Sequence, residues 1–219
     1  MIKVENSITD FFLDENIKCI GLQMSGGADS TLVAYLVAKT IVKNNLPITL
    51  KRITFGFGDK PDYFQKAEEI QKTITDTLSK DVWSTPYTVF YEKKSQHSTL
   101  KQLKYLYKNK FIDHTMNGRT KNPPLAEVED FDNSRVIERD TPLPIIDSFI
   151  TEPFWNITKD KIIKEFYLHG QEDLLHQTCS CDVNYSIDMK FPCGVCWWCK
   201  ERQWAFNKIG DFDDSSSKK

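Results

Sequence analysis

The stretch Ile17-Lys18-Cys19-Ile20-Gly21-Leu22-Gln23-Met24 runs directly into Ser25-Gly26-Gly27-Ala28-Asp29-Ser30. The first part is a short apolar run with clear bounds, which is typical of a buried parallel strand. After the second part, apolar residues recur at the spacing of an amphipathic helix, at Leu32, Val33, Leu36, Val37 and Ile41. The pattern therefore predicts a strand, a glycine turn and a helix in direct succession.

A turn of this kind can bind phosphate. Gly26 and Gly27 let the main chain approach a ligand closely, and the first N–H groups of the next helix attract an anion. Ser25 and Ser30 add hydroxyl donors, and Asp29 can cap the helix or hold a metal ion that bridges phosphates. The alternative is a plain tight turn capped by Asp29 or Ser30. The string is neither a Walker loop nor a dinucleotide fingerprint, because their signature residues are absent.

Strand-like and helix-like segments alternate beyond this turn. We expect further strands near residues 48–57, 87–91 and 111–116, with helices following the first two of them. This order favours an α/β fold with a doubly wound, mainly parallel sheet. Ligands of such sheets bind beyond the carboxyl ends of the strands, where the Ser25–Ser30 loop would lie.

Size and charge are those of an ordinary enzyme domain. The chain has 219 residues, of which 40% are hydrophobic and 27% charged, and its net charge is -2. This charge gives no reason to expect binding to nucleic acid or to an anionic membrane. The sequence has no apolar run of membrane-spanning length and no leader pattern, so we expect a cytoplasmic protein with reduced cysteines.

The region 117–157 loses this regularity. Prolines punctuate it, yet its aromatic and aliphatic residues indicate order, so we expect a substrate loop or a homodimer contact. Arg119, Arg135 and Arg139 are candidate clamps for a carboxylate or phosphate, with a plain exposed charge as the alternative for each. We expect residues 1–157 to bind nucleotide, residues 158–210 to form a helical and metal-binding part of the same domain, and residues 211–219 to be a disordered tail.

A helix is predicted after Thr158, a good N-cap, and Gly170 is expected to end it. Lys159 and Lys161 fall in its first turn. A helix N-terminus disfavours cations unless an anion is nearby, so we expect at least one of these lysines to face phosphate, with simple solvation as the alternative.

The second motif is Cys193-Gly194-Val195-Cys196-Trp197-Trp198-Cys199, with Cys179 and Cys181 upstream. Closely spaced thiolates suit a soft metal ion, and a closed site of four sulfurs favours a single structural Zn2+ over an iron–sulfur cluster. Physical reasoning does not separate Cys179 from Cys181 as the fourth ligand. A zinc deaminase is excluded, since none of the four histidines begins the required His-x-Glu pattern. We expect the tryptophans, including Trp204, to pack this small unit against the sheet.

The string Ser25 to Ser30 resembles the loop of the PP-loop ATP pyrophosphatases. Together with the cysteine motif, it makes the chain similar to the 7-cyano-7-deazaguanine synthase family, through Pro153-Phe154, Gly170-Gln171 and Asp173-Leu174 as well. The resemblance implies an adenine nucleotide alpha hydrolase-like fold, with Ser25, Gly26, Gly27, Ala28, Asp29 and Ser30 binding the pyrophosphate part of ATP. It further implies Asp29 and Lys159 as catalytic residues, and zinc ligands Cys179, Cys193, Cys196 and Cys199.

The reaction implied by the resemblance joins carbon to nitrogen. ATP with Mg2+ would adenylate 7-carboxy-7-deazaguanine, and ammonia would convert the adenylate to the amide or to the nitrile preQ0. The middle of the chain departs from the family, with Phe57-Gly58-Asp59-Lys60-Pro61 where a Tyr-Gly-Gln-x-His pattern is usual. Two other functions therefore stay open: a tRNA-modifying sulfurtransferase, and a non-catalytic, zinc-stabilised nucleotide-binding or defence-associated module.

Overall fold

The fold is built on a parallel β-sheet. The computed structural model describes residues 1–57, 62–91, 96–128, 148–181 and 192–210. Within these residues the sheet has five strands in the order β5-β4-β3-β6-β7, and every neighbouring pair is parallel. The strands are β3 (Cys19–Gln23), β4 (Thr49–Phe57), β5 (Trp83–Tyr91), β6 (His114–Met116) and β7 (Ile150–Thr151). The predicted parallel sheet is confirmed.

Strand β3 lies at the centre of this sheet and at its topological switch point. The chain proceeds from β3 through β4 to β5 on one side, and then continues on the other side with β6 and β7. The loops that leave β3 and β6 therefore diverge, and an open α/β sheet binds its ligands in the crevice formed there. The Ser25–Ser30 loop follows β3, so the order of strands places it at this crevice.

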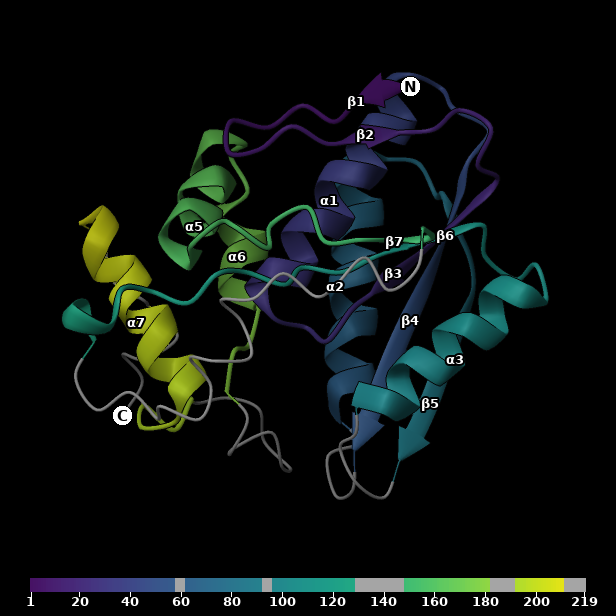
Figure 1. Cartoon of the computed structure of the whole chain (residues 1–219). Helices are drawn as coiled ribbons and strands as arrows, with labels where there is room; N and C mark the ends of the chain where they lie inside the picture. The colour runs from purple at the N-terminus through teal and green to yellow at the C-terminus, as the bar shows by residue number, and fades with distance from the viewer. Residues whose placement is uncertain (58–61, 92–95, 129–147, 182–191, 211–219) are drawn as a thin grey trace.

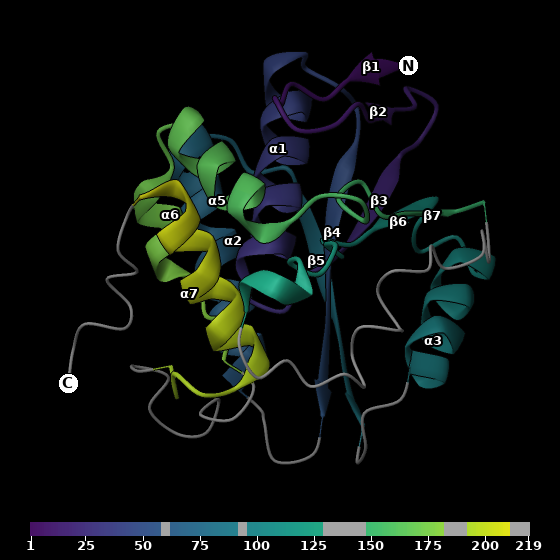
Figure 2. The same ribbon diagram turned by 60° about the vertical axis from the view of Figure 1, so that its left-hand side comes forward.

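Helices cover both faces of the sheet. Figures 1 and 2 show α1 (Ala28–Lys43) and α2 (Asp62–Leu78) on one face and α3 (Gln96–Lys108) on the other. Alternate residues of β3 point to opposite faces of the sheet. Ile20 and Leu22 belong to the hydrophobic core on the α1 side, whereas Cys19 packs against the cluster that contains Leu103 and Leu106 of α3. The doubly wound α/β class is thus confirmed. Helix α1 is buried on nearly every side, not only along the predicted stripe, because helices also flank it away from the sheet.

Three further helices lie beside α1 and α2. They are α5 (Lys159–Leu168), α6 (Glu172–Gln177) and α7 (Trp197–Ile209). Helix α5 contacts both α1 and α7, so α7 packs mainly against another helix (Figure 2). We had expected its tryptophans to pack against the sheet instead. Trp204 packs against the main core and donates its indole N–H to Glu127, in the short 3₁₀ helix η1 (Leu125–Glu127). A small antiparallel pair, β1 (Ile2–Lys3) and β2 (Phe12–Leu13), completes the described elements.

Some predictions fall outside the described residues. Arg135, Arg139, residues 129–147 of the expected substrate loop and the tail 211–219 belong to this group. The division at residue 157 stays a prediction. Among the helices that the structure describes, none combines the length and the apolar character needed to cross a membrane.

His114 gives the fold a predictable response to pH. It lies on β6, and its Nε2 is 2.8 Å from the Thr151 hydroxyl on β7. Burial lowers the pKa of His114 below 6.5, against a weaker opposing effect of Asp14. Below about pH 6.5 the unfolded chain therefore binds more protons than the folded one, and stability falls as the pH falls, by up to about 1.4 kcal/mol per pH unit for one such histidine.

We expect urea unfolding between pH 7.5 and pH 5 to show this loss, with a shallower pH dependence in His114→Gln. The pKa of His169 is also lowered, by burial and by Lys39. His169 therefore leaves a smaller fall of stability with falling pH in His114→Gln. Identical slopes in the two proteins would contradict the assignment to His114.

Candidate functional site

The loop between β3 and α1 has the backbone geometry of an anion site. Strand β3 ends at Gln23, Met24 donates its N–H to Ile53 at 2.9 Å, and helix α1 begins at Ala28. Gly26 has φ +83°, which side chains with a Cβ rarely adopt. The first turn of α1 therefore opens directly onto the crevice at the switch point, with its N–H groups directed to the loop.

Hydroxyl groups support the loop from within. Ser30 Oγ and Thr31 Oγ1 both donate to the Gly27 carbonyl, at 3.1 and 2.9 Å. Ser25 donates its N–H to Ser30 Oγ at 3.4 Å. The N-cap of α1 is Gly27, with no side-chain capping bond, so neither Asp29 nor Ser30 serves as the cap. The plain capped turn, which was the alternative for this string, does not match this arrangement.

Asp29 is instead one member of a buried charge cluster. Lys159 Nζ lies 3.0 Å from Asp29 Oδ2 and 2.9 Å from Glu201 Oε2. The side chain of Lys159 is 2% exposed, that of Glu201 is fully buried, and that of Asp29 is 18% exposed. Three elements, α1, α5 and α7, thus each supply one charge. Of the two lysines in the first turn of α5, Lys159 faces these carboxylates and Lys161 is exposed, and a contact of either with phosphate stays a prediction. Thr158 occupies the predicted N-cap position of α5 but makes no side-chain capping bond.

The cluster carries two carboxylates and one ammonium group, so its formal charge is negative. A buried ammonium group is stable only when it is paired, and Lys159 has a partner on each side. Asp29 is the most exposed of the three and the one that lies at the loop. A carboxylate in that position is suited to a hard divalent cation such as Mg2+, which a nucleotide phosphate would bring with it.

The segment after β6 closes the loop from the other side of the crevice. Gly118 is buried, and a Cβ built on it would lie 2.3 Å from the carbonyl carbon of Asp29 and 2.4 Å from the Ser30 nitrogen. This close approach of two backbones needs glycine. Arg119 does not extend alone toward a ligand: its Nη1 lies 3.4 Å from Glu152 Oε2, while Asn117 donates to Glu152 Oε1 at 2.8 Å. The proposed clamp is therefore an ion pair inside the protein.

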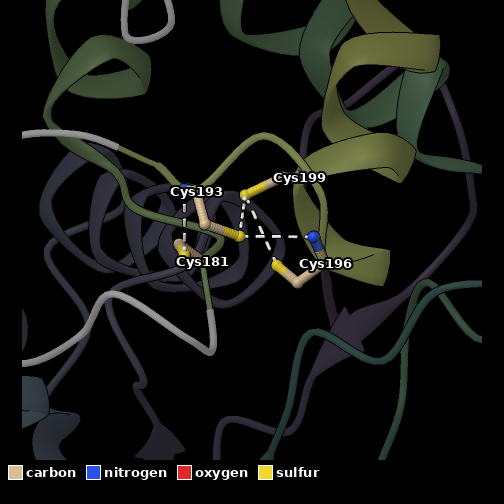
Figure 3. A group of neighbouring side chains, drawn as sticks. All are labelled: Cys181, Cys193, Cys196 and Cys199. Carbon is tan, nitrogen blue, oxygen red and sulfur yellow. Dashed lines mark hydrogen bonds between the residues drawn. The ribbon is translucent and has the colours of Figure 1, made fainter.

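Four cysteines form a second cluster near the start of α7. The sulfurs of Cys181, Cys193, Cys196 and Cys199 all lie within 4.8 Å of one another, and they could hold a metal ion (Figure 3). Backbone N–H groups donate to two of them: Cys193 N–H to Cys181 Sγ at 3.4 Å, and Cys196 N–H to Cys193 Sγ at 3.2 Å. Such N–H donors favour thiolates, and Gly194, at φ +73°, makes the tight turn between two ligands.

The spacing of these sulfurs suits one ion. Four sulfurs at zinc–thiolate distance form a tetrahedron with edges of about 3.8 Å. Cys199 Sγ lies 3.9 Å from Cys193 Sγ and 3.4 Å from Cys196 Sγ. A [4Fe–4S] cluster attaches each cysteine to a different iron, so its ligands stand farther apart. Contact with Cys196 and burial raise the pKa of Cys199, and a divalent cation would reverse that effect by binding the thiolate.

Cys179, the expected fourth ligand, lies elsewhere. Its N–H donates to the Gly26 carbonyl at 2.9 Å, so its backbone is held against the Ser25–Ser30 loop. Burial raises the pKa of its thiol. Residues two apart in an irregular segment can face different surroundings, and here it is Cys181 whose sulfur joins the other three. The arrangement thus differs from the predicted set in one member.

Two further residues of the site carried no signal in the sequence. Glu201 follows Cys199 by two residues and reads as an ordinary helical glutamate, yet it reaches Lys159. Arg202, which is 2% exposed, donates to Thr178 Oγ1 at 2.7 Å and to the Leu175 carbonyl at 3.3 Å. It thereby ties α7 to the segment that leads into Cys179.

No family model matches the chain, and no curated protein matches it. Among solved structures, it is similar to the U34-tRNA thiolase NcsA from Methanococcus maripaludis with its [4Fe-4S] cluster. The TM-score is 0.50 and the sequence identity 15%, over 80% of this chain and 63% of the thiolase. The chain thus spans less than two thirds of that protein, and the likeness establishes a shared α/β fold.

Proposed function

We propose that this chain binds ATP at the Ser25–Ser30 loop and adenylates an acceptor, with release of pyrophosphate. The observation that supports this most directly is the 3.0 Å contact between Lys159 and Asp29 at the switch point of the sheet. It places a cation and a carboxylate beside the N-terminus of α1. An anion with its own divalent cation is the ligand whose charges complement this pair.

Each group would have a separate task. The N–H groups of the loop would hold the pyrophosphate part of ATP, and Asp29 would hold Mg2+, which offsets the phosphate charge when bound. Lys159, desolvated and fixed on both sides, would stabilise the charge that develops as the bond between the α- and β-phosphates breaks. Catalysis in this scheme is positioning and electrostatic stabilisation, and it needs no general base from the chain.

The cysteine site would be structural. Four sulfur ligands complete the coordination of Zn2+ and leave no position for a substrate. Its place at the start of α7, where it joins the segment before the helix to the helix itself, agrees with a folding role.

The similarity in fold to a tRNA thiolase favours a tRNA base as the acceptor. The base oxygen would attack the α-phosphorus of ATP, pyrophosphate would leave, and a sulfide donor would then displace AMP to give the thiolated base. The net charge of -2 makes any tRNA contact depend on a local basic surface.

The second candidate acceptor is a carboxylate, as in the conversion of 7-carboxy-7-deazaguanine. The observation in its favour is the compact set of sulfurs, which suits a single closed zinc site and not the cluster named for the thiolase. The carboxylate oxygen would attack the α-phosphorus, and ammonia would displace AMP to form an amide. A second adenylation of the amide oxygen would permit its loss as AMP and leave the nitrile.

Pyrophosphate release tests the proposal. Wild-type protein should release pyrophosphate from ATP with either bulk tRNA and sulfide or 7-carboxy-7-deazaguanine and ammonia, and mass analysis of the products identifies the acceptor. We expect Asp29→Ala and Lys159→Met to lower the rate about 100-fold, the usual cost of one preorganised group. Lys161→Met, on the exposed side of the same helical turn, is the matched control and should keep the wild-type rate.

Full turnover in Asp29→Ala would overturn the proposal. ATP binding without pyrophosphate release under either condition would instead support the non-catalytic module.

A further inference from the structure

Helix α7 joins the cysteine cluster to the phosphate loop by a short path. Cys199 and Glu201 are two residues apart on this helix, and Cys196 is its N-cap. Cys199 contributes a sulfur to the metal-sized cluster, and Glu201 contributes a carboxylate to Lys159. A displacement of the first turn of α7 would therefore move both groups together.

Burial makes this path stiff. Glu201 is fully buried and Lys159 is 2% exposed, so water cannot replace either partner if the pair separates. The next residue, Arg202, holds α7 at a second point through Thr178 and Leu175. Helix α7 also packs along α5, which begins with Lys159. The ammonium group is thus held by a fully buried carboxylate on a helix that packs against its own.

The two carboxylates have unequal roles around this ammonium group. Asp29 is partly exposed at the loop, while Glu201 lies behind, in the interior. If Asp29 turns to a metal-bound phosphate, Lys159 loses one counter-charge but keeps the other. Without Glu201, the buried ammonium group would lose its fully buried counter-charge, and a movement of Asp29 toward a phosphate would then cost more free energy.

We propose that Glu201 is a positioning residue that couples metal occupancy of the cysteine site to nucleotide binding at the phosphate loop. The metal holds the start of α7, α7 holds Glu201, and Glu201 holds Lys159 while Asp29 turns to the nucleotide. This proposal rests on the proposed function, since it assumes that the loop binds ATP.

The test measures the ATP dissociation constant by calorimetry with Mg2+ present. Removal of a negative charge near an anion site would by itself strengthen ATP binding, so the sign of the effect is informative. We expect Glu201→Gln to weaken binding at least about tenfold, which corresponds to about 1.4 kcal/mol, with the metal content unchanged. Glu201→Asp keeps the carboxylate and should recover part of the affinity.

Glu165→Gln is the matched control. Glu165 is equally buried, at 1% exposure, and its carboxylate accepts the Ser7 N–H at 2.8 Å. It lies on α5 as Lys159 does, and the same chemical change there should leave the ATP affinity within about twofold of wild type. This variant separates a specific role of Glu201 from the general loss of a buried carboxylate.

Two further measurements establish the path. In the Lys159→Met background, Glu201→Gln should have no additional effect on ATP affinity, because Glu201 acts through Lys159. Stripping the metal with a chelator should weaken ATP binding in the wild type but add little in Glu201→Gln. Should Glu201→Gln fail to fold, the double variant, which removes both buried charges, supplies the same comparison with Lys159→Met alone.

The results distinguish a failure of the coupling from a failure of the proposed function. Unchanged or tighter ATP binding by Glu201→Gln overturns the coupling alone, as do independent effects of Glu201→Gln and Lys159→Met. A wild-type chain that binds no ATP overturns the proposed function, and this proposal with it.

Discussion

Replacing Cys181 by serine is expected to remove the bound metal, whereas the same change at Cys179 is expected to leave it in place. The sulfur of Cys181 lies within 4.8 Å of the other three, while the backbone of Cys179 is held against Gly26. A hydroxyl group is a much poorer ligand than a thiolate for Zn2+. Structural zinc contributes about 10 to 16 kcal/mol of binding free energy at neutral pH, which in such small units is folding energy.

Metal content per chain, measured by mass spectrometry of the purified proteins, checks this prediction. We expect about one Zn2+ in wild type and in Cys179→Ser, and close to none in Cys181→Ser. Cobalt reloading gives an independent readout, since its absorption reports how many sulfurs bind. Cys19→Ser, on strand β3, is a control far along the chain from the motif. Loss of metal from Cys179→Ser with retention in Cys181→Ser would reverse the assignment.

Gly118→Ala is expected to be among the most damaging single substitutions in the chain. The added methyl group would lie 2.3 to 2.5 Å from the carbonyl carbon and oxygen of Asp29 and the nitrogen of Ser30. These are backbone atoms at the start of α1, and they cannot rotate away as a side chain can. The loop after β6 would have to separate from α1. We expect a loss of at least about 3 kcal/mol in the free energy of unfolding, the upper end for overpacking.

The matched control is Gly27→Ala. A Cβ at Gly27 would meet only Ser25 Oγ at 3.6 Å and the Cys179 carbonyl at 3.7 Å, which are ordinary contacts. Its φ of −80° is open to any residue. Urea unfolding should therefore place Gly27→Ala within about 1 kcal/mol of wild type. Equal stability of the two variants would show that the Asn117–Arg119 segment does not press against the loop.

The alternation of strands and helices could be predicted because it depends on local periodicity. Strand β4 was expected at 48–57 and is Thr49–Phe57, and α5 begins directly after Thr158 as predicted. Strand β7 was missed, since two residues, Ile150 and Thr151, carry no period of their own and are a strand only because β6 offers an edge. The short pair β1 and β2 was missed for the same reason.

The residues of the candidate site can also be divided into those that local sequence predicts and those that depend on tertiary packing. The Ser25–Ser30 loop and the Cys193–Cys199 run are contiguous, so their chemistry could be read from spacing alone. Glu201 and Gly118 owe their roles to residues far along the chain, and only tertiary packing brings them to Lys159 and Asp29. The choice between Cys179 and Cys181 depends on the path of one irregular segment, which no periodicity describes.

The contact between Lys159 and Glu201 can form only late in translation, because Glu201 lies near the end of the chain. Asp29 leaves the ribosome early, and Glu201 follows about 170 residues later. At about 5 to 20 residues per second, this interval is roughly 10 to 35 s. Lys159 itself emerges only about 40 residues before Glu201, so for most of that time the Ser25–Ser30 loop lacks both its lysine and the second carboxylate that pairs with it. We therefore expect the newborn protein to complete the charge cluster around Lys159 only when α7 emerges, so that a chain terminated before α7 would lack the nucleotide site that we propose.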